Sequence, residues 1–174
     1  MVTGAGKTVL ALEAIRRFRK KHENARIRIV VPTIPLAQQW QTALLHHVKN
    51  PDFRPGFFGG GVKTSEDRRV VIYIVNSARD ALAQHVRRDL SLCRHVLLIC
   101  DECHHYQSKE NRRIFDFRIP PFYAPEQYAC LGLSATPFET AHNEVLLREL
   151  GEETYRYDFA EASAAGIVSQ FTVM

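Results

Sequence analysis

Short apolar runs alternate with amphipathic segments along most of this chain, and that alternation restricts its fold more than any other feature. Branched side chains dominate four such runs, at residues 27–31, 70–75, 95–100 and 129–133. Runs of this kind are typical of parallel strands buried on both faces of a sheet. Amphipathic helices are predicted between them, at residues 8–21, 36–48 and 78–90. The sequence therefore predicts an α/β, doubly wound fold, whose ligands bind at the carboxyl ends of the strands.

The remaining segments predict loops and a connection. With 174 residues, of which 45% are hydrophobic, we expect one domain. Proline and glycine predict loops at residues 51–61 and 119–125. After Gly151 the pattern suggests a short strand over 154–159 and a small helix over 160–165. We expect residues 1–157 to form the domain and residues 158–174 to begin a connection toward another domain.

Composition gives weaker information about partners and location. The net charge of +4 and a pI near 9.0 favour polyanionic partners slightly. The four cysteines are too few and too unevenly spaced for a secreted disulfide framework. The first residues are glycine-rich where a secretion signal has an apolar core, and no apolar stretch approaches the ~18 residues of a membrane span. We therefore expect a cytoplasmic protein without a membrane partner.

The strongest chemical motif is a glycine-rich string that opens directly into the first predicted helix. It consists of Thr3, Gly4, Ala5, Gly6, Lys7 and Thr8. In such a loop the glycines turn backbone N–H groups toward phosphates, the lysine reaches the β and γ phosphates, and the hydroxyl ligates magnesium. The alternative is a glycine turn before an ordinary amphipathic helix.

Two adjacent carboxylates follow the third apolar run. Asp101 and Glu102 stand where a buried strand is predicted to emerge at the carboxyl edge of the sheet. Asp101 would associate with Mg²⁺, and Glu102 would position and deprotonate the water that attacks a phosphoanhydride. The alternative is a solvated acidic turn. Together with the phosphate loop, the pair predicts a nucleotide hydrolase.

The acidic motif overlaps a second pattern of different chemistry. Cys100, Cys103 and His104 spell C-x-x-C-H, which is the attachment motif for c-type haem and offers three zinc ligands. Haem attachment belongs to exported chains, and structural zinc requires a fourth ligand. Alternation along the strand turns Cys100 away from the face of Asp101, so we interpret Cys100 as a small core residue.

Beyond these, a set of motifs in fixed order resembles the superfamily 2 (DExH-type, DEAD/DEAH box) helicases. The set is TGAGKT, VPTIPLAQQW, GGG, IVNSARD, DECHH and LSATPF, and it extends over nearly the whole chain. It is most similar to the bacterial group of restriction-enzyme Res subunits and related repair translocases. The resemblance implies the first RecA-like, ATP-binding domain of a P-loop NTPase motor. Because Met1 stands inside the usual phosphate-loop motif, we expect the domain to lack the strand that precedes the loop.

The resemblance also implies roles for individual residues. It makes the phosphate loop an ATP contact, Thr8 and Asp101 the Mg²⁺ residues, and Lys7, Asp101, Glu102 and His104 the catalytic set. Coupling of hydrolysis to strand movement would involve Ser134 and Thr136. Nucleic-acid backbone contacts would come from Pro32, Thr33, Gln39, Gly60 and Asn76. The pair Asn76–Ser77 departs from the family's usual Thr-Gln type pair.

The resemblance implies partners as well, and alternatives remain beside it. Nucleic acid, with DNA favoured over RNA, and a second RecA-like domain outside this chain are the expected partners, with restriction or repair subunits as further candidates. Without that second domain, residues 1–174 are expected to hydrolyse ATP slowly or not at all. The alternatives are a non-catalytic nucleotide- or nucleic-acid-binding remnant, an RNA helicase domain, and another ATPase class such as a transporter motor.

Overall fold

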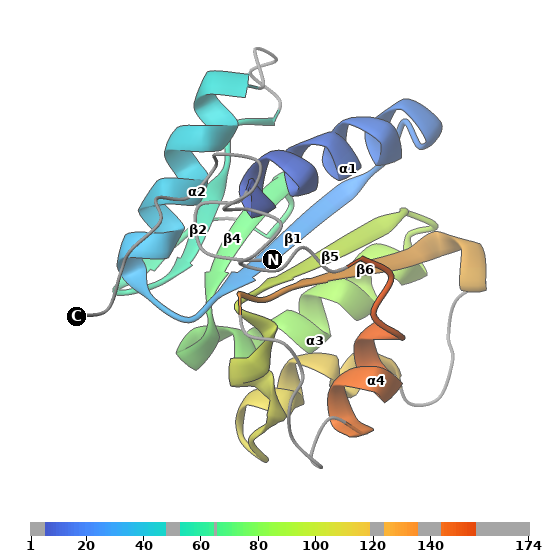
Figure 1. The fold of residues 1–174 in the computed structure, drawn as a ribbon. Coiled ribbons are helices and arrows are strands. Elements are labelled where there is room, and N and C mark those ends of the chain that lie inside the picture. The colour runs from blue at the N-terminus through green and yellow to red at the C-terminus, as the bar shows by residue number, and fades with distance from the viewer. Residues whose placement is uncertain (1–5, 48–52, 65, 119–123, 136–143, 156–174) are drawn as a thin grey trace.

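A central sheet of six strands organises the protein in the computed structural model, which describes residues 6–47, 53–64, 66–118, 124–135 and 144–155 (Figure 1). Its strand order is β3-β2-β4-β1-β5-β6, and every neighbouring pair is parallel except β2 with β3. The strands are β1 (Arg26–Val31), β2 (Gly56–Gly59), β3 (Val62–Lys63), β4 (Val70–Ile74), β5 (Val96–Asp101) and β6 (Tyr128–Leu133). The predicted parallel α/β sheet is confirmed.

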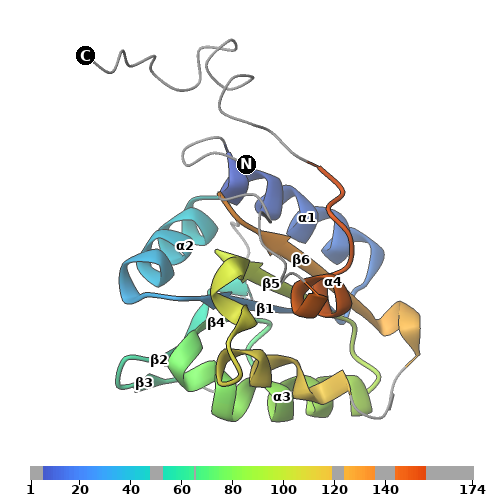
Figure 2. The same cartoon turned by 60° about the horizontal axis from the view of Figure 1, so that its bottom comes forward.

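Helices cover both faces of this sheet. Two of them, α1 (Lys7–Lys21) and α2 (Ile34–His47), lie on one face (Figure 2). The other face carries α3 (Val75–Ser91), the 3-10 segments η2 (Cys103–Gln107) and η3 (Asn111–Arg118), and α4 (Glu144–Leu150). A short η4 (Pro125–Gln127) leads into β6. Because β1, β4 and β5 are central, they are buried almost throughout, which explains their continuous apolar runs.

Two separate hydrophobic clusters form the core, one on each side of the sheet. Alternation along each strand sends neighbouring side chains into different clusters, so that Val30 packs toward α3 whereas Ile29 and Val31 pack toward α1 and α2. In the part of the chain that the structure describes, no helix is both long and apolar enough to cross a membrane.

The prediction of a loop over residues 51–61 is wrong in part. Gly56–Gly59 forms β2, which pairs with β4 on one side and with β3 on the other. Pairing with an existing strand and partial burial of Phe57 and Phe58 outweigh the weak strand propensity of the flanking glycines. The glycines Gly59, Gly60 and Gly61, all at positive φ, then form the turn between β2 and β3.

Toward the carboxyl terminus, the structure departs from the predicted elements in some segments and does not describe others. The helix α4 was not predicted, and its Leu146 is buried against the α3 side of the sheet. Thr154 and Tyr155 are not in a strand, contrary to the prediction for their positions. The remainder of the predicted strand, the predicted helix over 160–165 and most of the predicted loop over 119–125 lie outside the described residues.

A buried ion pair joins the amino-terminal half of β1 to α3. Arg28, with no exposed surface, bonds Asp89 of α3 at 2.5 Å, and Asp89 is 2% exposed. The Arg28 guanidinium also donates to the backbone carbonyls of Glu66 and Arg68. Arg94 bonds the other oxygen of Asp89 at 2.9 Å. This network joins β1, α3 and the segment before β4 at the sheet edge opposite Asp101.

Candidate active site

Lys7 lies at the start of α1 and faces the acidic motif at the end of β5. Gly6, at φ 83°, supplies the left-handed residue before the helix, a conformation that a residue with Cβ adopts at a cost. The Lys7 ammonium lies 2.6 Å from Oε1 of Glu102, and the two side chains are only 11% and 21% exposed. Thr8 follows in the first turn and is half-buried. The candidate residues Thr3, Gly4 and Ala5 lie outside the described residues.

Asp101 is the last residue of β5, and its carboxylate is fixed at both oxygens. The side chain is 5% exposed. Oδ1 accepts the backbone N–H of Glu102 at 3.0 Å, and Oδ2 accepts the indole N–H of Trp40 at 2.8 Å. A carboxylate offers about four lone-pair positions, so two hydrogen bonds leave capacity for a cation.

Glu102 turns the chain away from the sheet. Its φ of 48° is left-handed, which is uncommon outside glycine and occurs at many functional sites. Burial works to raise the pKa of Glu102, but the Lys7 ammonium and the backbone of Ala135 outweigh it and bring the pKa below its usual 4.5. Glu102 is therefore ionised at neutral pH and is able to accept a proton.

His104 connects the acidic motif to the loop after β6. Its Nδ1 lies 3.0 Å from the hydroxyl oxygen of Ser134 and 3.6 Å from Oε2 of Glu102. Burial lowers the pKa of His104 below 6.5, and the neighbouring His105 lowers it further. The structure thus brings Lys7, Glu102, His104 and Ser134 together, whereas Thr136 lies outside the described residues.

Two buried aromatic side chains at this edge escaped the sequence analysis. Trp40 reaches Asp101 from α2, and Tyr106 places its hydroxyl 2.9 Å from the carbonyl of Val30 and 2.7 Å from the carbonyl of Asp101. Both contacts tie the end of β5 to the β1–α2 unit. Trp40 and Asp101 lie 61 positions apart in sequence, so no local pattern could have identified the pair.

The residues expected to contact nucleic acid surround the carboxyl ends of β1, β2 and β4. Pro32 and Thr33 connect β1 to α2, and Asn76 lies in the first turn of α3. A Cβ added to Gly60 would lie 3.3 Å from Ile34 at the start of α2, so the glycine turn lies against that helix. Because β1, β2 and β4 run parallel to β5 in the same sheet, the three segments share one sheet edge with Asp101.

Two further polar side chains, Gln39 and Arg79, lie on α2 and α3, the helices that follow β1 and β4. Gln39 is exposed in the second turn of α2. Arg79, which the sequence analysis did not select, donates a hydrogen bond from its guanidinium to Oδ1 of Asn76 one turn away on α3. The spacing of three residues on a helix is the signal that could have identified this contact.

The cysteines of the C-x-x-C-H pattern lie in the core. Cys100 and Cys103 are 0% and 1% exposed. Burial raises the pKa of Cys103 to about 12 and raises that of Cys100 well above its usual value. The interpretation of Cys100 as a core residue is confirmed. Among the described residues, no group of three or more His, Cys, Asp or Glu side chains is arranged to hold a metal ion.

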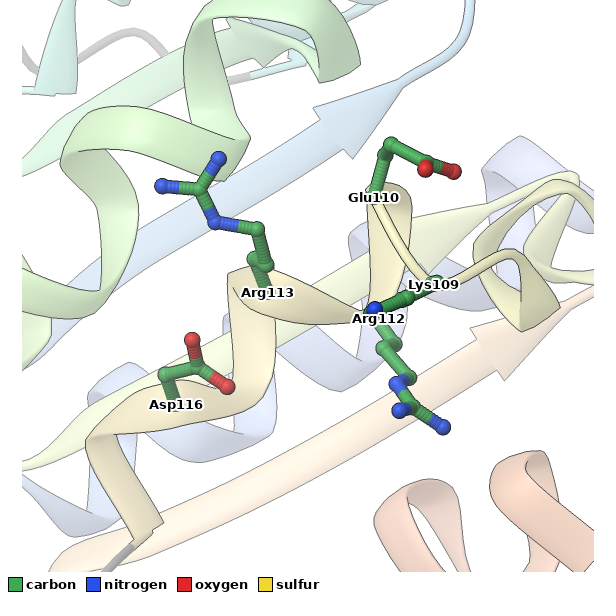
Figure 3. A pocket seen from close by; sticks show the side chains of 5 residues that line it. All are labelled: Lys109, Glu110, Arg112, Arg113 and Asp116. Atoms are coloured by element: carbon green, nitrogen blue, oxygen red, sulfur yellow. The ribbon is translucent and has the colours of Figure 1, made fainter.

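A shallow hollow of about 340 Å³ lies elsewhere on the surface, on and just before η3. Figure 3 shows the side chains that line it, which point in different directions: Lys109, Glu110, Arg112, Arg113 and Asp116. It contains none of the motif residues. Its mixed charges do not converge on a common point, so the hollow is a feature of the surface rather than part of the candidate active site.

The parallel sheet, the helix that starts at Lys7 and the acidic pair at the end of β5 define the N-terminal RecA-like domain of a superfamily 2 helicase. Comparison with known families agrees. The model of the family described as "Type III restriction enzyme, res subunit" matches residues 1–139, and the chain belongs to that family.

Individual relatives are longer proteins. The chain is 31% identical over 141 residues to the "Putative DNA 3'-5' helicase Rad25" of Haloarcula marismortui, covering 81% of this chain and 20% of that protein. It is 26% identical over 155 residues to the "Putative ATP-dependent RNA helicase QP509L" of African swine fever virus, covering 86% of this chain and 27% of that protein. Among solved structures, the Pyrococcus furiosus Hef helicase domain matches with a TM-score of 0.60 at 19% identity, over 87% of this chain and 32% of that one. This last similarity concerns the fold alone.

Proposed function

We propose that this chain is the ATP-hydrolysing domain of a DNA helicase or translocase. The observation that carries the proposal is the 2.6 Å ion pair between Lys7 and Glu102, which joins the phosphate-loop helix to the acidic motif across the sheet edge. A lysine and two carboxylates in this arrangement suit the binding of a nucleoside triphosphate and its hydrolysis.

Each residue has a defined task in that reaction. Lys7 exchanges its carboxylate partner for the β and γ phosphates of ATP, while the N-terminus of α1 adds its positive potential. Glu102, released from Lys7, orients the attacking water and accepts its proton. His104, which contacts both Ser134 and Glu102, transmits a change at the nucleotide to the loop after β6.

The donor atoms at this site fit magnesium. The Thr8 hydroxyl and the Asp101 carboxylate are hard oxygen ligands of the kind that Mg²⁺ prefers, and the absence of thiolate or imidazole from this pair argues against a zinc role for it. Thr8 and Asp101 would hold the ion. Bound magnesium would neutralise charge that develops on the phosphate oxygens.

Nucleic acid would bind at the same sheet edge. Its backbone would contact Pro32, Thr33, Gln39, Gly60 and Asn76. Polar groups and loop N–H donors bind the phosphate backbone without reading the bases, as a motor that moves along any sequence requires. Arg79, held by Asn76, adds a positive charge there. We favour DNA because the relative with the higher identity carries a DNA helicase name, and RNA is the second candidate.

A complete motor needs more than this domain. The chain spans about a fifth to a quarter of the lengths of the two relatives described above. We propose that residues 1–157 act with a second RecA-like domain, toward which residues 158–174 lead. That domain would supply an arginine finger, which contributes roughly 10³- to 10⁵-fold in rate, so slow hydrolysis is expected of residues 1–174 alone.

The test is hydrolysis of radiolabelled ATP under single-turnover conditions by the complete protein, with its second RecA-like domain, and by its Glu102→Gln variant. The amide preserves shape but accepts no proton, so the rate should fall by roughly 10²-fold or more while ATP binding persists. Glu126→Gln, at an exposed glutamate on η4, is the matched control and should leave the rate unchanged. Hydrolysis by Glu102→Gln at the parental rate would contradict the assignment.

A further inference from the structure

Trp40 is the single tryptophan of the chain, and it makes a specific polar contact inside the core. Its side chain is 1% exposed on the inner face of α2. The indole N–H, which can only donate, bonds Oδ2 of Asp101 at 2.8 Å. Core packing alone would require an apolar ring at this position but no donor directed at a carboxylate.

The neutral character of this donor matters at Asp101. A lysine or arginine in the same place would neutralise the carboxylate and repel a cation. The indole orients the carboxylate and leaves its negative charge available. Since the backbone N–H of Glu102 holds the other oxygen at 3.0 Å, the two neutral donors together fix the rotation of the carboxylate.

We propose that Trp40 is a positioning residue for the magnesium site, acting through Asp101. The inference rests on the proposed function, in which Asp101 associates with Mg²⁺. Hydrogen bonds from residues behind a metal ligand orient it, and their loss typically weakens metal affinity by 10- to 100-fold. Trp40 also belongs to the helix that starts directly after Pro32 and Thr33, so the proposed nucleic-acid loop and the magnesium acid share one rigid element.

The experiment replaces the indole N–H without changing the shape of the ring. Two variants of the whole chain carry, at position 40, phenylalanine (Trp40→Phe) or the tryptophan isostere benzothienylalanine, in which sulfur replaces N–H. Calorimetric titration with ATP over a series of Mg²⁺ concentrations gives the Mg²⁺ midpoint of nucleotide binding. Titration with ADP in EDTA gives the affinity without the metal, and far-UV circular dichroism verifies folding.

The positioning role predicts a specific pattern. Both variants should need roughly 10- to 100-fold more Mg²⁺ at the midpoint, while metal-free ADP affinity stays at the parental value. Leu44→Ala is the matched control, because Leu44 is equally buried on α2 but its side chain has no donor for the Asp101 carboxylate. It should lower thermal stability and leave the Mg²⁺ midpoint unchanged.

Failure of the inference and failure of the proposed function give different results. A parental Mg²⁺ midpoint in the benzothienylalanine variant would overturn the positioning role alone. Equal shifts in that variant and in Leu44→Ala would also overturn it, because packing would then explain the effect. If the parental chain bound ATP with no dependence on Mg²⁺, the proposed magnesium site and the role of Trp40 would both be contradicted.

Discussion

Replacing Asp89 with asparagine tests the network at the amino end of the sheet. Asp89 is 2% exposed and bonds the fully buried Arg28 at 2.5 Å and Arg94 at 2.9 Å. Arg26 lies 3.7 Å from the same carboxylate. The asparagine keeps the volume of the side chain but removes its charge, so a cluster of arginines loses its buried counter-charge.

The expected cost follows from the burial of Arg28. Removing one partner of a buried ion pair costs about 3–5 kcal/mol, because the remaining charge is left uncompensated away from water. A typical domain has only about 5–15 kcal/mol of stability in total. At roughly 2–4 °C per kcal/mol for a chain of this size, the melting temperature should fall by about 6–20 °C.

The assay is thermal and urea unfolding followed by far-UV circular dichroism. Asp67→Asn is the matched control, since Asp67 also lies near Arg94 and Arg88, at 3.6 Å, but is 53% exposed. Exposed pairs contribute about 0.2–1 kcal/mol, so this variant should melt close to the parental chain. If Asp89→Asn lost no more stability than Asp67→Asn, the reasoning from burial would be refuted.

Two further predictions concern the β2–β3 turn and the buried thiols. Gly59→Ala should destabilise the domain by roughly 1–3 kcal/mol in urea unfolding, because its φ is 132° and a Cβ would lie 2.8 Å from Ile74. Gly61→Ala, with open space around it, should cost only the strain of φ 84°, and equal losses in both variants would contradict the clash. Iodoacetamide should modify the exposed Cys93 before unfolding, whereas Cys100, buried and with a raised pKa, should react only after unfolding. Mass spectrometry of native and urea-unfolded samples shows which of the two cysteines is labelled in each state. Labelling of Cys100 in the native sample would refute its burial.

Local periodicity accounts for the elements that the sequence analysis predicted correctly. The strands β1, β4, β5 and β6 and the helices α1, α2 and α3 are each encoded by neighbouring residues, and their observed ends differ from prediction by a few residues at most. The strand β2 was missed because its two phenylalanines are flanked by turn residues, and its stability comes from pairing with β4.

At the candidate site too, some features could be predicted from the sequence and others could not. The rule that ligands bind at the carboxyl ends of parallel strands was sufficient to predict the edge of the sheet at which Lys7 lies 2.6 Å from Glu102. The donor on Trp40 and the buried pair of Arg28 with Asp89 each depend on residues 61 positions away. Such contacts are set by how α2 and α3 pack on the sheet, which no local pattern contains.

Binding of ATP by Lys7→Ala tests the central claim most directly. Loss of hydrogen bonds from a charged group costs about 1.5–3 kcal/mol, so ATP affinity in the presence of Mg²⁺ should fall roughly 10- to 150-fold by calorimetric titration. Lys20→Ala, an exposed lysine at the other end of α1, makes the same change of charge and should bind ATP like the parental chain. Equal affinity of Lys7→Ala and Lys20→Ala for ATP would contradict a phosphate-binding role for Lys7.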